Sequence, residues 1–524
     1  MIKPIIWAIG GTDSGGGAGL AADQRAADSL DAHLCTVVTA VTAQNSLGVS
    51  HIHALPLETI DAQLQALERD LPALAIKTGL LGGVQQIQAV ARWVDRLRHA
   101  GPLALIVDPV LGSSSGASFI EQGTIAAYRE LLLPRATLVT PNRGEARALL
   151  GLADDDAQDI PALAAALRAL GAEGVCITGG DETDGDESSG DESSELALDW
   201  MDTSDATGWL ALPRVRTANN HGTGCTFATS VAASLAHGFA LGDAIVLAKM
   251  ATAHALHHGY RAGSGAGPVH AKSGFLADAT LMPQLSWSAR PDFAPFEPRD
   301  AAAAPLGLYA ITDRAARIAD LLRSGVGTVQ LRIKHEEGLS ADVLGTEIRT
   351  AIALCAAAGT PLFINDHQQL ARVENAPGVH LGQEDLLRLN DDQRELLRQA
   401  EGMDLGISSH SLCELARARS MAPRYIACGP VWPTTTKDMP WLPQGLDRLR
   451  WWCRLAGAPV VAIGGILQPE QAAAAAASGA DGVCVLRGLG TDPAQTVPVF
   501  LQAMAAAIRP PACLDVRIGQ LVPR

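Results

Sequence analysis

A turn that contains two glycines, Asn219 to Thr226, is the stretch of this sequence best suited to phosphoryl chemistry. It follows a short apolar segment (210–215) and leads into an alanine-rich run (227–236) that we interpret as a helix. Glycines at a helix start leave backbone N–H groups unpaired, and the helix dipole adds partial positive charge there. The turn is therefore suited to stabilising a phosphoryl group in transit, with an ordinary glycine-rich loop as the alternative.

The composition indicates a globular α/β protein of several domains. A chain of 524 residues with 48% apolar and 4% aromatic residues is too long for one ordinary core. No run approaches the ~20 apolar residues of a membrane span, and the net charge of −16 argues against nucleic-acid binding. The N-terminus lacks a signal-peptide pattern, and the nine cysteines form no C-x-x-C pair. We therefore expect a cytoplasmic protein without a zinc site or a disulfide framework.

A strongly acidic stretch accounts for half of the net charge. Residues 181–195 contain eight acids and no base, and Gly-Asp-Glu-Ser-Ser occurs twice in succession there. Such a run cannot bury itself, so we predict a solvated, mobile loop, with a cation-binding role as the less favoured alternative.

The first half alternates apolar strand segments with helical ones. The predicted strands are 5–9, 34–43, 73–77, 103–107, 137–140 and 175–178, and the predicted helices include 20–30, 60–70, 85–99, 123–132 and 160–170. This alternation indicates a mostly parallel sheet covered on both faces, in which ligands bind beyond the carboxyl ends of the strands. Polar residues follow those ends: Thr12-Asp13, Gln44-Asn45, Lys77, Asp108, Asn142 with Glu145, and Gly179-Gly180.

Several of these segments together resemble one kinase group of the ribokinase-type fold, the hydroxymethylpyrimidine/phosphomethylpyrimidine kinases of thiamine biosynthesis. The matching segments are Gly10 to Gly19, Ala40 to Asn45, Ile106 to Val110, Thr140 to Ala146, His221 to Thr226 and Gly267 to His270. The resemblance covers about residues 1–276.

This first resemblance implies a set of site residues. It implies that Gly11, Asp23 and Gln44 hold the aminopyrimidine, and that Asn142 and Glu145 organise magnesium and the phosphates of ATP. Gly222, Thr223 and Gly224 would form the anion hole.

The same resemblance makes Cys225 a candidate catalytic residue. A thiol at a helix N-terminus is expected to have a lowered pKa, so Cys225 would act as the general base; a small residue packing under the turn is the alternative. Thr178 departs from the pattern, because the family usually has Lys there.

The boundary between the halves is predicted at residues 277–304, a proline-bearing linker. Eight apolar runs follow: 308–311, 328–331, 362–364, 379–381, 405–407, 425–428, 460–463 and 482–486. Helical segments separate most of them. Eight strands alternating with helices predict a (β/α)8 barrel, whose active site is built at the carboxyl ends of the strands.

The residues at those strand ends suit the handling of a polyanion. Arg332, Lys334 and Lys437 supply positive charge. Asp366 and Asp385 are hard oxygen ligands of the kind that magnesium takes together with substrate phosphates. Gly464-Gly465 and the segment after strand eight stand where barrels often bind a phosphate. A structural ion-pair network around the barrel rim is the alternative.

The second half closely resembles thiamine phosphate synthase over about residues 305–508. The matching segments are Tyr309 to Asp313, Val329 to Lys334, Phe363 to His367, Gly378 to Asp385, Gly406 to Ser411, Gly429 to Lys437 and Ala462 to Ile466.

That resemblance implies roles at the strand ends. Asp366 and Asp385 would bind Mg2+. The pyrimidine pyrophosphate would be held by Gln330, Arg332, Lys334, Asn365, Ser408 and Lys437, of which Arg332 and Lys437 would also be catalytic. The thiazole phosphate would be held by Thr434, Thr435, Thr436, Gly465, Leu486 and Arg487. Arg487 departs from the pattern, because the family usually has Ser there; it would add a charge contact or block the pocket.

We therefore predict a bifunctional α/β enzyme with a kinase domain (1–276), a linker (277–304) and a synthase domain (305–524). ATP would phosphorylate 4-amino-5-hydroxymethyl-2-methylpyrimidine twice, and the diphosphate would then be coupled with thiazole phosphate to give thiamine phosphate. Its partners would be small molecules, without nucleic acid or membrane, and a homo-oligomer is compatible with the sequence.

Three alternatives remain. One is a kinase of another small alcohol such as pyridoxal. Another is a catalytically impaired half that serves for binding or regulation. A purely structural protein is the third.

Overall fold

The computed structural model describes residues 3–112, 123–153, 158–179, 195–295, 306–334, 340–434, 442–508 and 516–522. The contacts divide the chain into two compact units, Met1–Pro291 with Val516–Val522 and Asp292–Asp515 with Pro523–Arg524. Most of the acidic repeat, together with Gly180, Thr435, Thr436, Lys437 and residues 296–304 of the predicted linker, lies outside the described residues. The domain boundaries therefore stay predictions.

The first unit is built on a ten-stranded sheet in the order β10-β9-β8-β7-β6-β5-β4-β1-β2-β3. Its strands are β1 (Ile5–Gly11), β2 (His33–Asn45), β3 (Gly48–Ala54), β4 (Ala75–Thr78), β5 (Ala104–Val107), β6 (Leu138–Val139), β7 (Val175–Ile177), β8 (Leu196–Asp202), β9 (Thr207–Pro213) and β10 (Gln284–Leu285). Neighbours from β2 to β7 pair in parallel, whereas β3 and β8 to β10 pair antiparallel at the two edges. The parallel centre brings the carboxyl ends of its strands to one edge.

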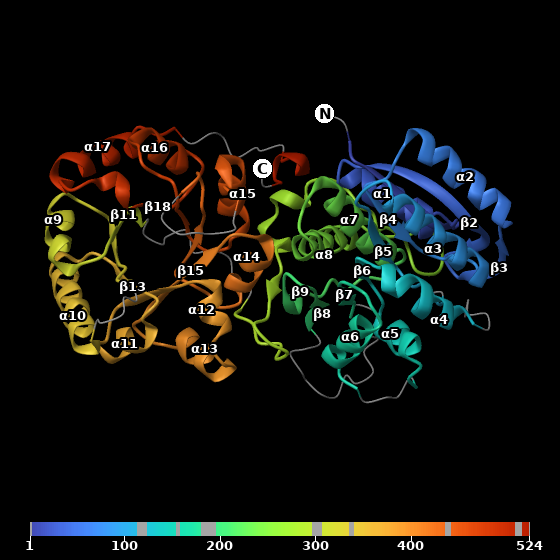
Figure 1. Ribbon diagram of the computed structural model, residues 1–524, viewed down its shortest axis with the longest axis horizontal. Helices are drawn as coiled ribbons and strands as arrows, with labels where there is room; N and C mark the ends of the chain where they lie inside the picture. The colour runs from blue at the N-terminus through green and yellow to red at the C-terminus, as the bar shows by residue number, and fades with distance from the viewer. Residues whose placement is uncertain are drawn as a thin grey trace. The chain divides into compact units, whose positions relative to one another are not determined.

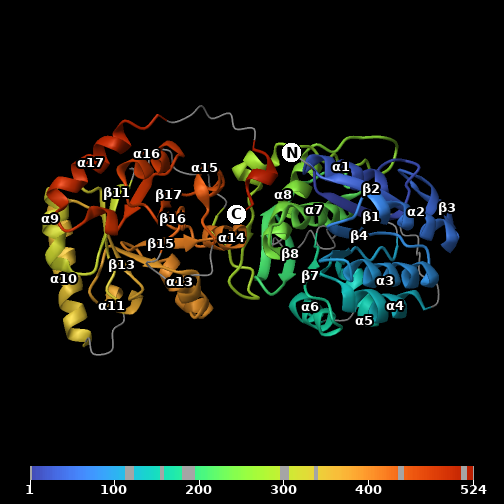
Figure 2. The same ribbon diagram turned by 45° about the horizontal axis from the view of Figure 1, so that its top comes forward.

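Helices lie along both faces of this sheet (Figure 1). Figure 2 shows α3, α4 and α5 on one side of it and α7 and α8 on the other. The helices are α1 (Gly19–Ser29), α2 (Leu57–Asp70), α3 (Val84–Arg98), α4 (Thr124–Ala127), α5 (Arg143–Leu150), α6 (Ile160–Ala169), α7 (Thr223–His237) and α8 (Leu241–His257). Short apolar strands buried on both faces and helices with one apolar face lead to this layering. The mostly parallel, doubly covered sheet is confirmed, and the unit has the ribokinase-like fold.

The second unit is a closed barrel of eight parallel strands within the described residues. They are β11 (Gly307–Thr312), β12 (Thr328–Leu331), β13 (Leu362–Asn365), β14 (Gly378–Leu381), β15 (Asp404–Ser409), β16 (Tyr425–Cys428), β17 (Val460–Ala462) and β18 (Gly482–Val485). Strand β18 pairs with β11 and closes the ring. The helices are α9 (Ile318–Arg323), α10 (Ala341–Ala358), α11 (Gln368–Val373), α12 (Gln383–Leu387), α13 (Asp391–Arg398), α14 (Leu412–Arg419), α15 (Gly445–Leu455), α16 (Pro469–Ala477) and α17 (Pro493–Ala505). The predicted (β/α)8 barrel is confirmed.

Large side chains fill the interior of the barrel. Tyr309, Phe363 and Tyr425 are each 1% exposed and belong to one apolar cluster with Ile311 and Cys484. The Phe363 and Tyr425 rings meet edge to face with their centroids 5.0 Å apart. The barrel is therefore a packed core with a floor of aromatic rings, and a ligand is restricted to its carboxyl end.

Strands at the edges of the first sheet are the elements that the sequence pattern missed. β3 is a half-exposed edge strand with histidines and a serine, so no apolar run marks it. The described helices include none that is long and apolar enough to cross a bilayer.

Candidate active sites

The glycine loop after β1 is organised by Asp13. Its Oδ1 accepts a hydrogen bond from the backbone N–H of Gly15 (2.8 Å), and its Oδ2 accepts bonds from Gly17 (2.9 Å) and Ala18 (2.8 Å). Burial opposes the charge on this carboxyl, but hydrogen bonds from His221 and the amides outweigh it and hold its pKa below the ordinary value. A charged Asp13 therefore fixes the loop.

His221 connects three segments that are far apart in the sequence. Its Nε2 lies 3.2 Å from Asp13 Oδ2 and 3.2 Å from Gln44 Nε2. Gly17 permits this approach, because a Cβ built there would lie 2.4 Å from His221 Cδ2. Gln44, predicted to hold the aminopyrimidine, thus stands beside the glycine loop and the turn before α7.

The predicted anion-hole turn begins α7, as expected. Gly222 is its N-cap with φ 88°, and a Cβ there would lie 2.5 Å from the carbonyl oxygen of Gly17. Gly224 is exposed, and a Cβ built on it would lie 4.0 Å from Asp108 Oδ1. The turn therefore faces a strand-end carboxylate. Its role in catalysis stays a prediction.

A buried lysine that was not among the candidate site residues lies beneath this turn. Lys77 in β4 is 1% exposed, and its Nζ lies 3.0 Å from Asp23 Oδ1 and 3.3 Å from Asp108 Oδ2. The sequence marked Lys77 only as a polar residue at a strand end, and its place in an apolar strand indicates burial with partners, because a charge is buried only with partners.

Asp23, predicted to hold the aminopyrimidine, is buried in an ion pair. Its side chain is 2% exposed, and its Oδ1 accepts hydrogen bonds from Lys77 Nζ and from Thr229 Oγ1 (2.7 Å). Gly11, the other residue predicted to lie near the pyrimidine, is also buried, at the end of β1. Their predicted contact with the pyrimidine stays a prediction.

The expectation of a lowered thiol pKa at Cys225 is wrong. The residue is partly exposed, yet the protein atoms around it raise its pKa to about 12 through desolvation. The Lys77 ammonium lowers this pKa, while the carboxylates of Asp23 and Asp108 raise it. The helix N-terminus alone does not decide the protonation of this thiol.

Asn142 and Glu145 form a capping box at the start of α5. Asn142 Oδ1 accepts from the Glu145 N–H (2.8 Å), and Glu145 Oε2 accepts from the Asn142 N–H (3.0 Å). Thr178 pairs with Asn142 in an isolated parallel bridge. The box is a structural role that both residues already fill, and their predicted contact with magnesium and ATP phosphates stays a prediction.

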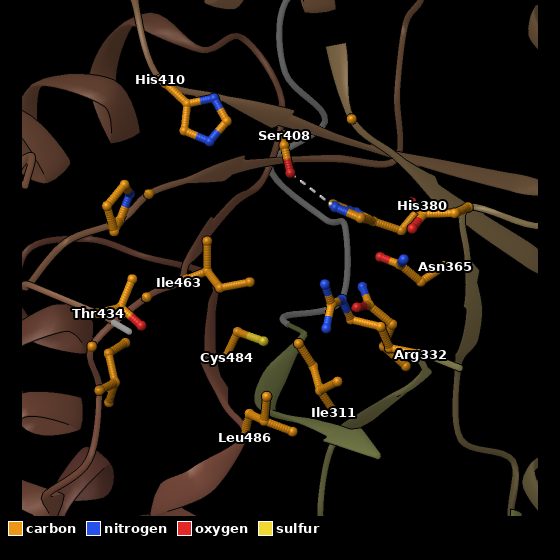
Figure 3. A pocket seen from close by; sticks show the side chains of 18 of the residues that line it. Ile311, Arg332, Asn365, His380, Ser408, His410, Thr434, Ile463, Cys484 and Leu486 are labelled. Atoms are coloured by element: carbon orange, nitrogen blue, oxygen red, sulfur yellow. Dashed lines mark hydrogen bonds between the residues drawn. The ribbon is translucent and has the colours of Figure 1, made fainter. Parts of the chain in front are cut away.

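A cavity of about 470 Å³ opens at the carboxyl end of the barrel (Figure 3). Ten of the predicted site residues line it: Gln330, Arg332, Asn365, Asp366, Asp385, Ser408, Thr434, Gly465, Leu486 and Arg487. Figure 3 shows Arg332, Asn365 and His380 across the cavity from Thr434 and Ile463. The parallel strands of a closed barrel bring these ends to one rim, although the residues span more than 150 positions.

Two residues predicted to bind phosphate in the barrel are not among the described residues that line the cavity. Lys334 is exposed and is not among the residues that line the cavity. Lys437 lies outside the described residues. Among the lining residues Arg332, Arg388 and Arg487 supply positive charge, of which Arg388 was not predicted.

The carboxylates of the cavity suit a magnesium ion that also binds substrate phosphates. Asp366, Glu384 and Asp385 all line it. Asp366 has a φ of 66°, a left-handed conformation that a non-glycine residue adopts at a cost. The described residues contain no group of three or more His, Cys, Asp or Glu that could hold a metal by themselves. Magnesium needs only one or two carboxylates when phosphates and water complete its shell, so this donor set fits.

Two histidines near the cavity were missed as site residues. His380 Nε2 lies 3.0 Å from Ser408 Oγ, and His410 Nδ1 lies 2.8 Å from Glu414 Oε2. Both line the cavity. His410 follows β15, where the strand-end pattern marks it without giving it a role, whereas His380 lies inside β14, where that pattern does not distinguish it from a core histidine.

Family comparisons match the two halves separately. The family model for phosphomethylpyrimidine kinase matches residues 13–270, and that for thiamine monophosphate synthase matches residues 308–489. A hydroxymethylpyrimidine/phosphomethylpyrimidine kinase of Haemophilus influenzae is 39% identical over 270 residues, which are 51% of this chain and 96% of that one.

Two plant relatives span both halves. A probable thiamine biosynthetic bifunctional enzyme of Oryza sativa is 34% identical and covers 89% of this chain and 82% of its own. A thiamine biosynthetic bifunctional enzyme of Arabidopsis thaliana is 33% identical, with 88% and 85% covered. Both are named chloroplastic, which contradicts the cytoplasmic location expected from the N-terminal sequence.

Proposed function

The chain belongs to the bifunctional thiamine biosynthetic enzymes, and from this premise we propose which of its residues carry each reaction. Its first half is a hydroxymethylpyrimidine/phosphomethylpyrimidine kinase with ATP as co-substrate, and its second half is a thiamine phosphate synthase. The observation that carries the residue assignment is the barrel cavity, where carboxylates, an arginine and a glycine pair from different strands converge.

In the kinase half we assign pyrimidine binding to the surface formed by Gln44 and His221. The two side chains are hydrogen-bonded and lie beside the glycine loop. The amides at the start of α7, from Gly222 to Gly224, stabilise the charge that builds on the transferred phosphoryl group. Asn142 and Glu145 are assigned to the nucleotide side, where Mg2+ would neutralise phosphate charge.

Cys225 is the proposed acceptor of the hydroxyl proton. To accept that proton the side chain must be a thiolate, so a thiol with a pKa of about 12 first passes its own proton to solvent and then takes the proton of the hydroxyl. The Lys77 ammonium, which lowers this pKa, would stabilise the thiolate until it takes the proton. Asp23 and Asp108 hold Lys77 in place.

In the synthase half the pyrimidine diphosphate is assigned to the side of the cavity with Arg332 and Asn365. Arg332 binds the diphosphate and draws negative charge onto the departing pyrophosphate. Asp366 and Asp385 would hold a Mg2+ ion, which supplies further charge neutralisation when bound. Lys334 and Lys437 remain predicted phosphate contacts.

The thiazole phosphate is assigned to the other side of the cavity. Gly464 and Gly465 have φ values of 89° and 73°, and a Cβ on Gly465 would lie 2.6 Å from Trp432 atoms. Their backbone amides, with Thr434 and the Leu486–Arg487 segment, cradle the phosphate. The thiazole nitrogen then attacks the pyrimidine methylene as pyrophosphate leaves.

One reaction tests the assignment. Purified protein is given hydroxymethylpyrimidine, thiazole phosphate, ATP and Mg2+, and the products are identified by mass spectrometry. Thiamine phosphate is expected. Accumulation of the pyrimidine diphosphate would show an impaired barrel, with Arg487 as the first residue to revert. Absence of any phosphorylated pyrimidine would contradict the kinase assignment, and the diphosphate would then be supplied to test the barrel alone.

Pyridoxal is the competing kinase substrate. Parallel assays with pyridoxal and hydroxymethylpyrimidine decide between them, and Gln44→Ala should lower kcat/KM for the pyrimidine. Faster phosphorylation of pyridoxal by the wild-type protein would overturn the assignment.

A further inference from the structure

A chain of hydrogen bonds runs from the barrel cavity into the core and back, and three of its members, Gln330, His380 and Ser408, line the cavity. Gln330 Nε2 donates to Tyr309 Oη (3.2 Å), and Tyr309 Oη lies 2.7 Å from Tyr425 Oη. Tyr425 Oη lies 2.8 Å from His380 Nδ1, and His380 Nε2 lies 3.0 Å from Ser408 Oγ. Gln330 and Ser408 both line the cavity, so the chain begins and ends at the cavity.

The links of this chain are buried and well ordered by packing. Tyr309 and Tyr425 are each 1% exposed, and His380 is 5% exposed. The His380 and Tyr425 rings are stacked, with centroids 5.6 Å apart and planes 12° from parallel. Water therefore does not replace the links, and each hydroxyl must place its single hydrogen on a neighbour in the chain.

The number of hydrogens on each group fixes which partner donates at every link, so all the hydrogen bonds of the chain point the same way. The Gln330 amide donates to Tyr309, so the Tyr309 hydrogen goes to Tyr425. The Tyr425 hydrogen then goes to His380 Nδ1, which leaves the imidazole proton on Nε2. Nε2–H donates to Ser408 Oγ. The opposite direction requires a rotated Gln330 amide and reverses every link, because no hydroxyl can donate twice.

We infer that this chain of hydrogen bonds couples two choices: whether Gln330 presents a donor or an acceptor to the pyrimidine ring, and whether Ser408 does. The coupling selects a 4-aminopyrimidine. In the first direction the amide oxygen of Gln330 is left as an acceptor and the hydroxyl hydrogen of Ser408 is left as a donor. Neither end reverses without the other. The inference rests on the proposed binding of the pyrimidine diphosphate in this cavity.

The chemistry of the ring explains the selection. A 4-aminopyrimidine places an N–H donor beside a ring-nitrogen acceptor, which complements one acceptor and one donor in the wall. A 4-oxopyrimidine places a C=O acceptor beside a ring N–H donor, the reverse pattern. Binding it costs either two unpaired buried polar groups or reversal of all the links. Tyr309, Tyr425 and His380 are thus positioning residues for specificity.

Nitrogen-15 NMR of the wild-type full chain tests the direction without any substitution. The ring-nitrogen shifts of His380, assigned by their loss in His380→Gln, should show a neutral imidazole with its proton on Nε2. A proton on Nδ1, or an even mixture of the two tautomers, would overturn the inference.

A substrate pair tests the consequence. The 4-amino and 4-oxo pyrimidine diphosphates are supplied directly with thiazole phosphate, and kcat/KM is measured for each. The wild-type protein should prefer the amino compound by about 100-fold or more. Tyr425→Phe and Tyr309→Phe should each reduce this ratio at least tenfold, since Gln330 and Ser408 then orient independently. Tyr260→Phe, at an exposed tyrosine of the first unit, should leave it unchanged.

The outcomes separate the inference from the proposed function. If Tyr425→Phe and Tyr309→Phe lower kcat/KM equally for the 4-amino and the 4-oxo diphosphate, the tyrosines have a merely structural role and the inference is overturned. Equal kcat/KM of the wild-type protein for the two diphosphates would also overturn the inference, while leaving the synthase assignment intact. Failure of the wild-type protein to make thiamine phosphate from the supplied amino diphosphate would instead contradict the proposed function, whatever the NMR shows.

Discussion

Lys77 Nζ and Asp23 Oδ1 lie 3.0 Å apart in an ion pair whose side chains are 1% and 2% exposed. Asp108 Oδ2 approaches the same ammonium at 3.3 Å. Burial raises the pKa of Asp108, while Lys77 opposes that rise. Two carboxylates thus depend on one lysine beneath the turn that begins α7.

Lys77→Met should therefore destabilise the protein strongly. Removing the ammonium leaves two buried carboxylates without a counter-charge, and the expected loss is about 3–5 kcal/mol in the free energy of unfolding. Urea denaturation followed by tryptophan fluorescence measures it. Lys3→Met is the matched control, because its ion pair with Asp31 is about half exposed and should contribute less than about 1 kcal/mol. Similar losses of unfolding free energy in Lys77→Met and Lys3→Met would contradict the role of Lys77 as the counter-charge of two buried carboxylates.

Cys225 should react slowly with an alkylating reagent at neutral pH. Its raised pKa, about 12, means that a smaller fraction of thiolate is present at any given pH than for an ordinary thiol. The alkylation rate, followed by peptide mass mapping, should rise about tenfold per pH unit from 7 to 10 without levelling off. A plateau below pH 9 would show a low pKa, and Cys225→Ser identifies the peptide.

Asp366→Asn should abolish the synthase reaction and leave the kinase reaction intact. Loss of a proposed magnesium ligand should lower the rate of thiamine phosphate formation by 100-fold or more, about 3 kcal/mol of transition-state stabilisation. Each half is assayed with its own substrates. Asp447→Asn, at an aspartate whose side chain is 67% exposed on α15, is the control. Equal loss of both activities would count against independent sites.

Arg487→Ser tests the one residue in the cavity that departs from the synthase pattern. Arg487 lines the cavity at the start of the short helix after β18. As a charge-assisted phosphate contact it contributes roughly 1.5–3 kcal/mol, so the substitution should raise KM for thiazole phosphate tenfold or more with little change in kcat. A lower KM would show that the arginine obstructs the pocket.

Gly17→Ala should impair the kinase half alone. The new Cβ would lie 2.4 Å from His221 Cδ2, so the imidazole must move away from Asp13 and Gln44. We expect KM for hydroxymethylpyrimidine to rise at least tenfold. Gly101→Ala is the control, because nothing lies within 4 Å of its added Cβ. Unchanged kinetics in Gly17→Ala would separate His221 from substrate binding.

Much of the barrel site could be predicted, because a residue that follows an apolar strand must lie at the rim of a parallel barrel. This reasoning placed Arg332, Asn365 and Ser408 in one cavity. It failed for Lys334, which follows the same strand as Arg332 but is exposed. Beyond the last strand residue the alternation of side chains no longer holds, so the direction of a loop side chain depends on the loop itself.

Roles at the kinase site were harder to predict because burial decides them. Asp23 belongs to a helix with no strong apolar stripe, and nothing in the sequence shows that it pairs with Lys77 rather than with a ligand. The Cys225 pKa was predicted from the helix N-terminus alone and was wrong, because desolvation outweighs that effect.

The amino-acid sequence by itself determined the two fold types, the order of the central strands along the chain and the residue types at the strand ends, because local periodicity and turn chemistry encode these features. The tertiary structure alone decided which polar groups are buried and which partners they meet. Tyr309 and Tyr425 are 116 residues apart, yet their hydroxyls lie 2.7 Å from each other. Such a contact depends on closure of the barrel and on the register of its strands, and these are properties of the packed whole rather than of any segment.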